Sequence, residues 1–198
     1  LWNGTNWTET NNLNTARSDF PGGSGTDNTS AICAGGYTTA NVANVETWNG
    51  TNWTEVNDLN VAKRGLGSAR QTSTSSIVFG GYATTSLATA ESWNGTNWTE
   101  ENDLSATRNQ IGGAGSSSTN AIAFGGDTST STEEWTGAGV AIGAWSTGGS
   151  LNQGRYGIAS SGTVTASIAF GGRISPPNVI QDLTESYDGT SWTEVNDL

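Results

Sequence analysis

A pair of glycines recurs four times along the chain at nearly constant spacing, and this tandem repeat restricts the possible folds more than any other feature. The intervals between successive pairs are 45, 45 and 46 residues. Periods of about 20 to 50 residues are typical of solenoids, propellers and related repeat architectures. The pairs are Gly35-Gly36, Gly80-Gly81, Gly125-Gly126 and Gly171-Gly172.

Other residue types keep the same register. A short apolar segment precedes each glycine pair, a glutamate follows it two positions before an aromatic residue, and a second tryptophan comes next. The glutamates are Glu46, Glu91, Glu133 and Glu185, and the second tryptophans are Trp53, Trp98, Trp145 and Trp192. The agreement divides the chain into an incomplete unit at 1–13 and complete units at 14–59, 60–104, 105–151 and 152–198.

Each complete unit predicts four short strands. The segment that follows the repeated arginine, 65–69 in the second unit, is rich in small residues, which suits an innermost strand where sheets converge. The apolar run before the glycine pair forms the second strand, the Glu-x-Trp segment the third, and the Trp-Thr-Glu segment the fourth. Asn49-Gly50 stands between the last two strands and supplies the positive φ of a hairpin turn.

This pattern resembles the Kelch repeat over nearly the whole chain. The resemblance implies an all-β fold, a Kelch-like β-propeller with four complete four-stranded blades plus an N-terminal half blade at 1–13. Within the repeat, Trp-Asn-Gly-Thr-Asn-Trp-Thr-Glu also resembles repeats of phage fibre-like and bacterial surface proteins.

The half blade would leave an open strand edge, which invites pairing. We therefore expect strands from outside these residues to complete it, either upstream in a longer chain or from another chain. Its tryptophans, Trp2 and Trp7, are in register with Trp48 and Trp53. They should pack as those two residues do.

An arginine beyond the leucine recurs as faithfully as the glutamate. A residue used once in every blade belongs to the construction of the blade, so we predict Arg–carboxylate pairs that tie neighbouring strands. The arginines assigned to this structural set are Arg17, Arg64, Arg108 and Arg155, with the glutamates Glu46, Glu91, Glu133 and Glu185. The paired tryptophans could stack on sugars, but their repetition favours packing between sheets.

Composition excludes several classes of function. The net charge is −11 with only seven Lys and Arg residues, whereas phosphate binding needs clustered positive charge, so we expect no nucleic-acid partner. No run of about 18 apolar residues is present, so we expect no membrane insertion.

The chain has no histidine and one cysteine. We therefore expect no catalytic residue, no metal and no cofactor, and no enzyme activity. Galactose oxidase shares the propeller fold, but its chemistry needs copper-ligating histidines. Cys33 aligns with Val78, Ala123 and Ala169, which predicts a buried apolar role.

The places where the repeats differ are better candidates for binding, because loops on a rigid scaffold carry recognition. The longest insertion follows the last glycine pair, and a second one stretches the hairpin at 136–144. Antiparallel topology predicts that these two loops lie on opposite faces. The candidate ligand residues of the first loop are Arg173, Pro176, Pro177, Asn178 and Gln181.

These observations favour a non-enzymatic propeller module of a virion or cell-surface fibre, acting as a structural part or in attachment to a host protein or glycan. Its partners would be other copies or fibre subunits and a host-surface ligand, at a virion or extracellular location. The alternative is a protein-interaction Kelch propeller within a larger protein.

Overall fold

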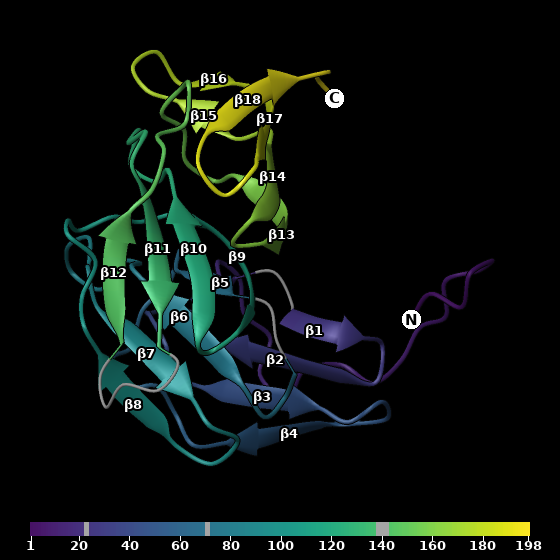
Figure 1. Ribbon diagram of the computed structural model, residues 1–198. Coiled ribbons are helices and arrows are strands. Elements are labelled where there is room, and N and C mark those ends of the chain that lie inside the picture. Colours follow the sequence, from purple (N-terminus) through teal and green to yellow (C-terminus); the bar gives the residue numbers. More distant parts are fainter. Residues whose placement is uncertain (22–23, 70–71, 138–142) are drawn as a thin grey trace.

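The chain folds into four antiparallel four-stranded sheets and one small hairpin (Figure 1). The computed structural model describes residues 1–21, 24–69, 72–137 and 143–198. Helix is absent from these ranges. Accordingly, no helix in the described chain has the length and hydrophobicity that a membrane span requires.

Each sheet consists of strands from one sequence repeat, in chain order. The first sheet contains β1 (Ser24–Asp27), β2 (Ser30–Ala34), β3 (Val45–Trp48) and β4 (Trp53–Val56). The second contains β5 (Gly67–Ala69), β6 (Ser76–Phe79), β7 (Ala90–Trp93) and β8 (Trp98–Glu101). The third contains β9 (Gly112–Ser117), β10 (Asn120–Phe124), β11 (Thr132–Thr136) and β12 (Ala144–Thr147).

The fourth sheet differs by an insertion. It contains β13 (Ala159–Thr163), β14 (Ala166–Phe170), β17 (Thr184–Tyr187) and β18 (Trp192–Val195). Between β14 and β17 the inserted residues form a separate hairpin of β15 (Arg173–Ile174) and β16 (Val179–Ile180). The predicted second, third and fourth strands are thus confirmed in all four repeats.

Pairing between the third and fourth strands aligns the two tryptophans of a repeat. Trp48 is opposite Trp53 in the first sheet, with ring centroids 5.5 Å apart. The connecting turn closes on Asn49, whose side-chain Oδ1 accepts hydrogen bonds from the backbone N–H groups of Thr51 (3.0 Å) and Asn52 (2.9 Å). Gly50 follows at φ 91°, a conformation that favours glycine.

The hydrophobic core lies between sheets rather than within them. Three clusters of buried side chains fill the interfaces between successive sheets. One lies between the first and second sheets, one between the second and third, and one between the third and fourth. In the last two clusters a phenylalanine of one sheet meets a tryptophan of the next: Phe79 with Trp145 at 5.1 Å and Phe124 with Trp192 at 4.7 Å. These edge-to-face contacts stabilise the interfaces beyond their buried area.

The sheets follow one another around an arc, with β5, β9 and β13 on its inner side (Figure 1). Extensive contacts join β5 to β9 and β9 to β13. The short innermost strands are rich in Gly, Ala and Ser, which lets them approach closely. This succession of sheets is consistent with a β-propeller-like fold, and the arc is open between its first and fourth sheets.

The N-terminal segment projects from the arc (Figure 1). Trp2 and Trp7 form a β-bridge, and their rings are 5.6 Å apart at 43°, close to the geometry of Trp48 and Trp53. Their exposure is 46% and 79%, however, while Trp48 is 4% exposed. The prediction of equal packing is wrong, because none of the described sheets covers the outer side of this hairpin.

Candidate functional site

One buried ion pair in each sheet joins a basic residue to the glutamate of the third strand. Arg17 lies 2.5 Å from Glu46, Lys63 2.8 Å from Glu91, and Arg155 2.6 Å from Glu185. Arg108 pairs with Glu133 in the same way, and its pKa is lowered by burial, an effect that the charge of Glu133 opposes. All eight side chains are at most 6% exposed.

The glutamates are satisfied by more than the cation. The other carboxylate oxygen accepts a hydrogen bond from the backbone N–H that follows the repeat leucine, as in Asn60 to Glu91 (2.7 Å) and Asn152 to Glu185 (2.7 Å). Arg155 also donates to the backbone carbonyls of Gly171 (2.8 Å) and Leu183 (2.7 Å). The ion-paired side chains thus bind the connecting segment to the sheet. They are buried, so they present no surface to a ligand.

The assignment of Arg64 to this set is wrong. The cation stands four residues after the repeat leucine, a spacing that places Lys63 after Leu59 just as it places Arg108 after Leu104. Lys63 is fully buried and pairs with Glu91. Arg64 is the next residue, so its side chain leaves the sheet interface.

Arg64 stacks on two tyrosines from successive repeats. Its guanidinium carbon is 4.5 Å from the ring centroid of Tyr37 and 5.4 Å from that of Tyr82. Both rings attract the cation electrostatically. The structure shows no hydrogen bond from the guanidinium to any described residue, so its N–H donors are available to another molecule.

The residues two positions after the buried cations form a row along the inner side of the arc. Backbone hydrogen bonds link one repeat to the next: Gly65 N–H donates to Asp19 (2.7 Å), Gln110 to Gly65 (2.6 Å), and Gly157 to Gln110 (2.9 Å). Each of these four residues has a positive φ, including Asp19 at 55° and Gln110 at 52°. Left-handed backbone at two non-glycine residues is uncommon and clusters at functional sites.

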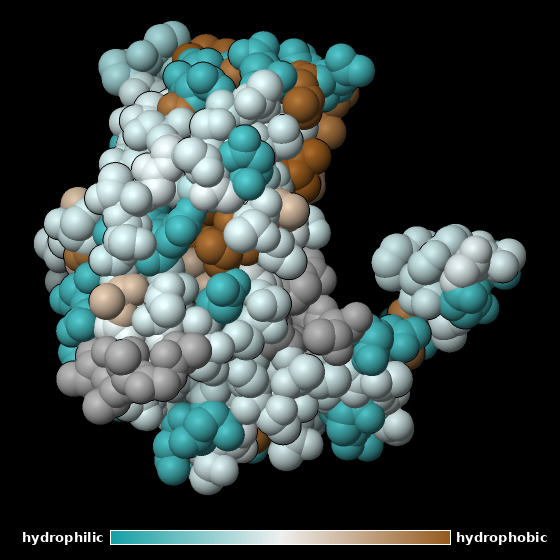
Figure 2. All heavy atoms as spheres, in the orientation of Figure 1, coloured by the Kyte–Doolittle hydropathy of each residue, from teal (hydrophilic) through white to brown (hydrophobic). Residues whose placement is uncertain are grey.

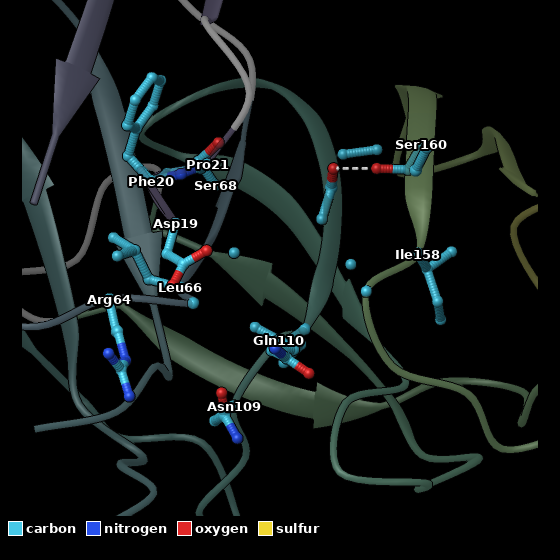
Figure 3. Close-up of a pocket in the computed structure, with 18 of the residues that line it drawn as sticks. Asp19, Phe20, Pro21, Arg64, Leu66, Ser68, Asn109, Gln110, Ile158 and Ser160 are labelled. Atoms are coloured by element: carbon cyan, nitrogen blue, oxygen red, sulfur yellow. Dashed lines mark hydrogen bonds between the residues drawn. The ribbon is translucent and has the colours of Figure 1, made fainter. Parts of the chain in front are cut away.

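This row borders a cavity of about 580 Å³ at the centre of the arc. Figure 3 shows Arg64, Asn109 and Gln110 at one end of the cavity, Phe20 and Pro21 at the other, and Ser160 across from them. Ser160 is held there by a hydrogen bond of 2.7 Å to the carbonyl of Gly113. We call the group Asp19, Arg64, Asn109 and Gln110 the cavity mouth.

The mouth residues are fixed by their neighbours. Asn109 donates from its backbone N–H and from its side chain to the carboxylate of Asp127, at 3.0 and 2.8 Å. Asp127 also accepts from Ser86 Oγ at 2.9 Å. A polar arrangement of this kind, on rigid strands, can bind a ligand that carries both hydrogen-bond donors and acceptors.

The loop predicted from the long insertion lies on the same side as the mouth. Arg173, Pro176, Pro177 and Asn178 are exposed, and Gln181 is half-buried. Asn178 accepts a hydrogen bond of 3.1 Å from the hydroxyl of Tyr156, and Tyr156 pairs through its backbone with Arg173. The insertion therefore extends the mouth toward the fourth sheet. The other predicted loop, 136–144, includes residues 138–142, which lie outside the described residues.

No group of three or more metal-ligating side chains occurs among the described residues. Cys33 is buried, and burial raises the pKa of its thiol to about 11. This environment keeps the thiol protonated and unreactive near neutral pH.

Sequence reasoning missed the cavity mouth, although a signal was present. The residue after each buried cation is Ser18, Arg64, Asn109 or Tyr156, and the residue after each glycine pair is Tyr37, Tyr82, Asp127 or Arg173. These are the positions at which otherwise similar repeats differ. If the second repeat is aligned on Lys63 instead of Arg64, these positions predict a surface that varies between repeats.

Neither a known protein-family model nor a curated protein matches this sequence.

Proposed function

We propose that this chain is a non-enzymatic Kelch-like β-propeller module, with four complete blades, that binds a ligand at its cavity mouth. It would serve a virion or cell-surface fibre as an attachment part. The observation that carries the proposal is the separation of roles within the repeat. The basic residue and the glutamate that recur in every repeat form buried ion pairs, while Arg64 and Asn109, at the varying position beside the cation, line the cavity.

The mouth favours an acidic, polyhydroxylated ligand, such as a glycan that contains a carboxylated sugar. Arg64 offers the free N–H donors of a planar guanidinium, a group suited to bidentate binding of a carboxylate. Asn109 and Gln110 add amide groups, and Phe20 adds an aromatic face at the far end of the cavity. The ligand must be small or present only a terminal unit, because the cavity holds about 580 Å³.

The test is a glycan array followed by titration calorimetry on the best acidic glycan. We expect binding that Arg64→Ala reduces at least tenfold and that Arg64→Lys restores only in part, because lysine keeps the charge but not the planar fork. Arg173→Ala should reduce binding less than Arg64→Ala does, since Arg173 lies in the insertion beside the mouth and does not line the central cavity.

Two results would count against the proposal. Glycan binding that is indifferent to Arg64→Ala would place recognition elsewhere on the molecule. An array without any binding, combined with capture of a specific protein that depends on Arg64, would favour the alternative of a protein-interaction propeller.

A further inference from the structure

The fourth sheet has one face that its counterparts bury. Ile168 is 37% exposed, whereas the equivalent Ile77 and Ile122 are completely buried against the following sheet. Phe170 is half-buried, while Phe79 and Phe124 are fully buried. We call the group Ile168, Phe170 and Asn196 the C-terminal face. Figure 2 shows hydrophobic surface along the edge of the last sheet that faces the projecting N-terminal segment.

Glycine packing shows the same difference. A Cβ added at Gly35, Gly80 or Gly125 would lie within 2.7 Å of a backbone carbonyl of the next repeat. At Gly171 the nearest such atom is 3.7 Å away and belongs to the same repeat. The fourth sheet is therefore shaped for a following unit that the described chain does not place there.

The internal interfaces show what that unit must supply. First, a tryptophan from its fourth strand packs on the phenylalanine, as Trp145 packs on Phe79. Second, its hairpin turn accepts hydrogen bonds from an asparagine of the preceding sheet: Asn57 Nδ2 donates to Thr96 O (2.8 Å) and Asn97 Oδ1 (2.9 Å). Asn196 is the residue equivalent to Asn57 in the fourth sheet.

The N-terminal hairpin, residues 1–8, carries each of these groups in register. Trp7 is equivalent to Trp98, and Thr5 and Asn6 are equivalent to Thr96 and Asn97. The hairpin is already formed, because Asn3 Oδ1 accepts from the backbone N–H groups of Thr5 (2.9 Å) and Asn6 (2.8 Å). Trp7 is nevertheless 79% exposed, because none of the described sheets packs on its ring.

We infer that the N-terminal hairpin seats on the C-terminal face of the same chain, with Trp7 on Phe170 and with Asn196 donating to Thr5 and Asn6. The hairpin would then close the arc as the outer half of a fifth blade. The segment that follows the hairpin is already attached to the first sheet, because Asn11 Nδ2 donates hydrogen bonds to Thr51 O (2.9 Å) and Asn52 Oδ1 (2.7 Å). Figure 1 places the hairpin and the fourth sheet on the same open side of the arc, which favours closure within one chain over exchange with a second copy.

Cysteine cross-linking tests this closure in a Cys33→Ala background. The pair Asn6→Cys and Asn196→Cys should form a disulfide within a monomer at micromolar protein concentration, detected by intact mass and by migration on a non-reducing gel. The matched control is Asn11→Cys with Asn52→Cys, since these two side chains are in contact in the structure. A control disulfide without the test disulfide would overturn the inference, and so would a test disulfide found only in dimers.

A double-mutant cycle provides a second measurement that does not depend on disulfide geometry. Trp7→Ala should lower the melting temperature by several degrees, and its effect should be largely lost in the Phe170→Ala background, because residues in contact are not additive. Effects of Trp7→Ala and Phe170→Ala that simply add would overturn the contact. Glu9→Ala, beyond the hairpin, should leave the melting temperature unchanged in both backgrounds.

Discussion

Lys63 and Arg64 are adjacent, carry the same charge and have different surroundings. Lys63 is fully buried and pairs with Glu91 at 2.8 Å, as the cations of the other repeats pair with their glutamates. Arg64 is half-buried, lies over Tyr37 and Tyr82, and borders the central cavity. Repetition thus marks the residues that build the scaffold. The position next to the buried cation varies between repeats, and its residues, such as Arg64, are free to bind a ligand.

The largest difference between these two cations should be in stability. Lys63→Ala leaves the carboxylate of Glu91 buried without its counter-charge, which costs about 3 to 5 kcal/mol of unfolding free energy. That is a large part of the total for a domain of this size. Lys63→Arg should lose much less, because arginine occupies the same position in the other three repeats. Urea unfolding followed by tryptophan fluorescence measures both.

The expected difference between the two cations would be wrong if Lys63→Ala lost no more unfolding free energy than Arg64→Ala. In that case the buried pair would be no more important to the fold than the stacked cation beside it.

The next largest difference in stability should be between alanine substitutions at a glycine packed against the next sheet and at a glycine that faces open space. Gly125 and Gly157 have φ values of 65° and 62°, so alanine at either position costs about 1 to 2 kcal/mol of backbone strain. A Cβ at Gly125 would also meet Arg155 O at 2.7 Å, whereas at Gly157 nothing lies within 4 Å. Gly125→Ala should therefore cost about 1 to 3 kcal/mol more, the usual range for overpacking. Equal losses in thermal unfolding would show that the sheet interface yields easily.

Much of the fold could be predicted because the repeat records it directly. Apolar runs, glycine pairs and the Asn-Gly turn are local signals, and the strands fall where those signals place them. The buried ion pairs were also predictable at Arg17, Arg108 and Arg155. The second repeat was misread because the residue type of Arg64 was given more weight than its spacing from Leu59.

The cavity mouth and the exposure of Trp7 depend on the arrangement of whole sheets. Asp19, Arg64 and Gln110 are about one repeat apart in sequence, and only the curvature of the arc brings them together. Trp7 has the same local sequence as Trp53 and the same turn. Its surroundings differ because burial depends on neighbouring sheets, which a local pattern does not specify.

Removing the cation at the mouth should have a small effect on stability. Arg64→Ala loses its contacts with Tyr37 and Tyr82, worth about 0.5 to 1 kcal/mol at exposed sites. Its fold should therefore remain intact under conditions in which Lys63→Ala is partly unfolded. Melting curves of the two variants at neutral pH, with circular dichroism as the readout, make this comparison. A loss of several kcal/mol in Arg64→Ala would assign Arg64 to the scaffold after all.

The smallest effect concerns Cys33, which is buried beside the Arg17–Glu46 pair and whose equivalents in later repeats include Ala123 and Ala169. Cys33→Ala should change stability by about 1 kcal/mol or less at pH 7, because alanine already occupies this position elsewhere. At high pH the two proteins should diverge. Burial raises the pKa of the folded thiol from 9.0 to about 11, so between these values the unfolded chain releases its proton while the folded chain retains it.

Deprotonation then favours the unfolded state, and the wild-type protein should lose stability between about pH 9 and 11 relative to Cys33→Ala. Below pH 8 the difference between the two should be constant, since the thiol is protonated in both states. Urea unfolding of both proteins across this range isolates the cysteine, because every other titrating group is shared. Parallel pH profiles would mean that water reaches Cys33 in the folded protein, and hence that the first sheet is less tightly covered than the second and third.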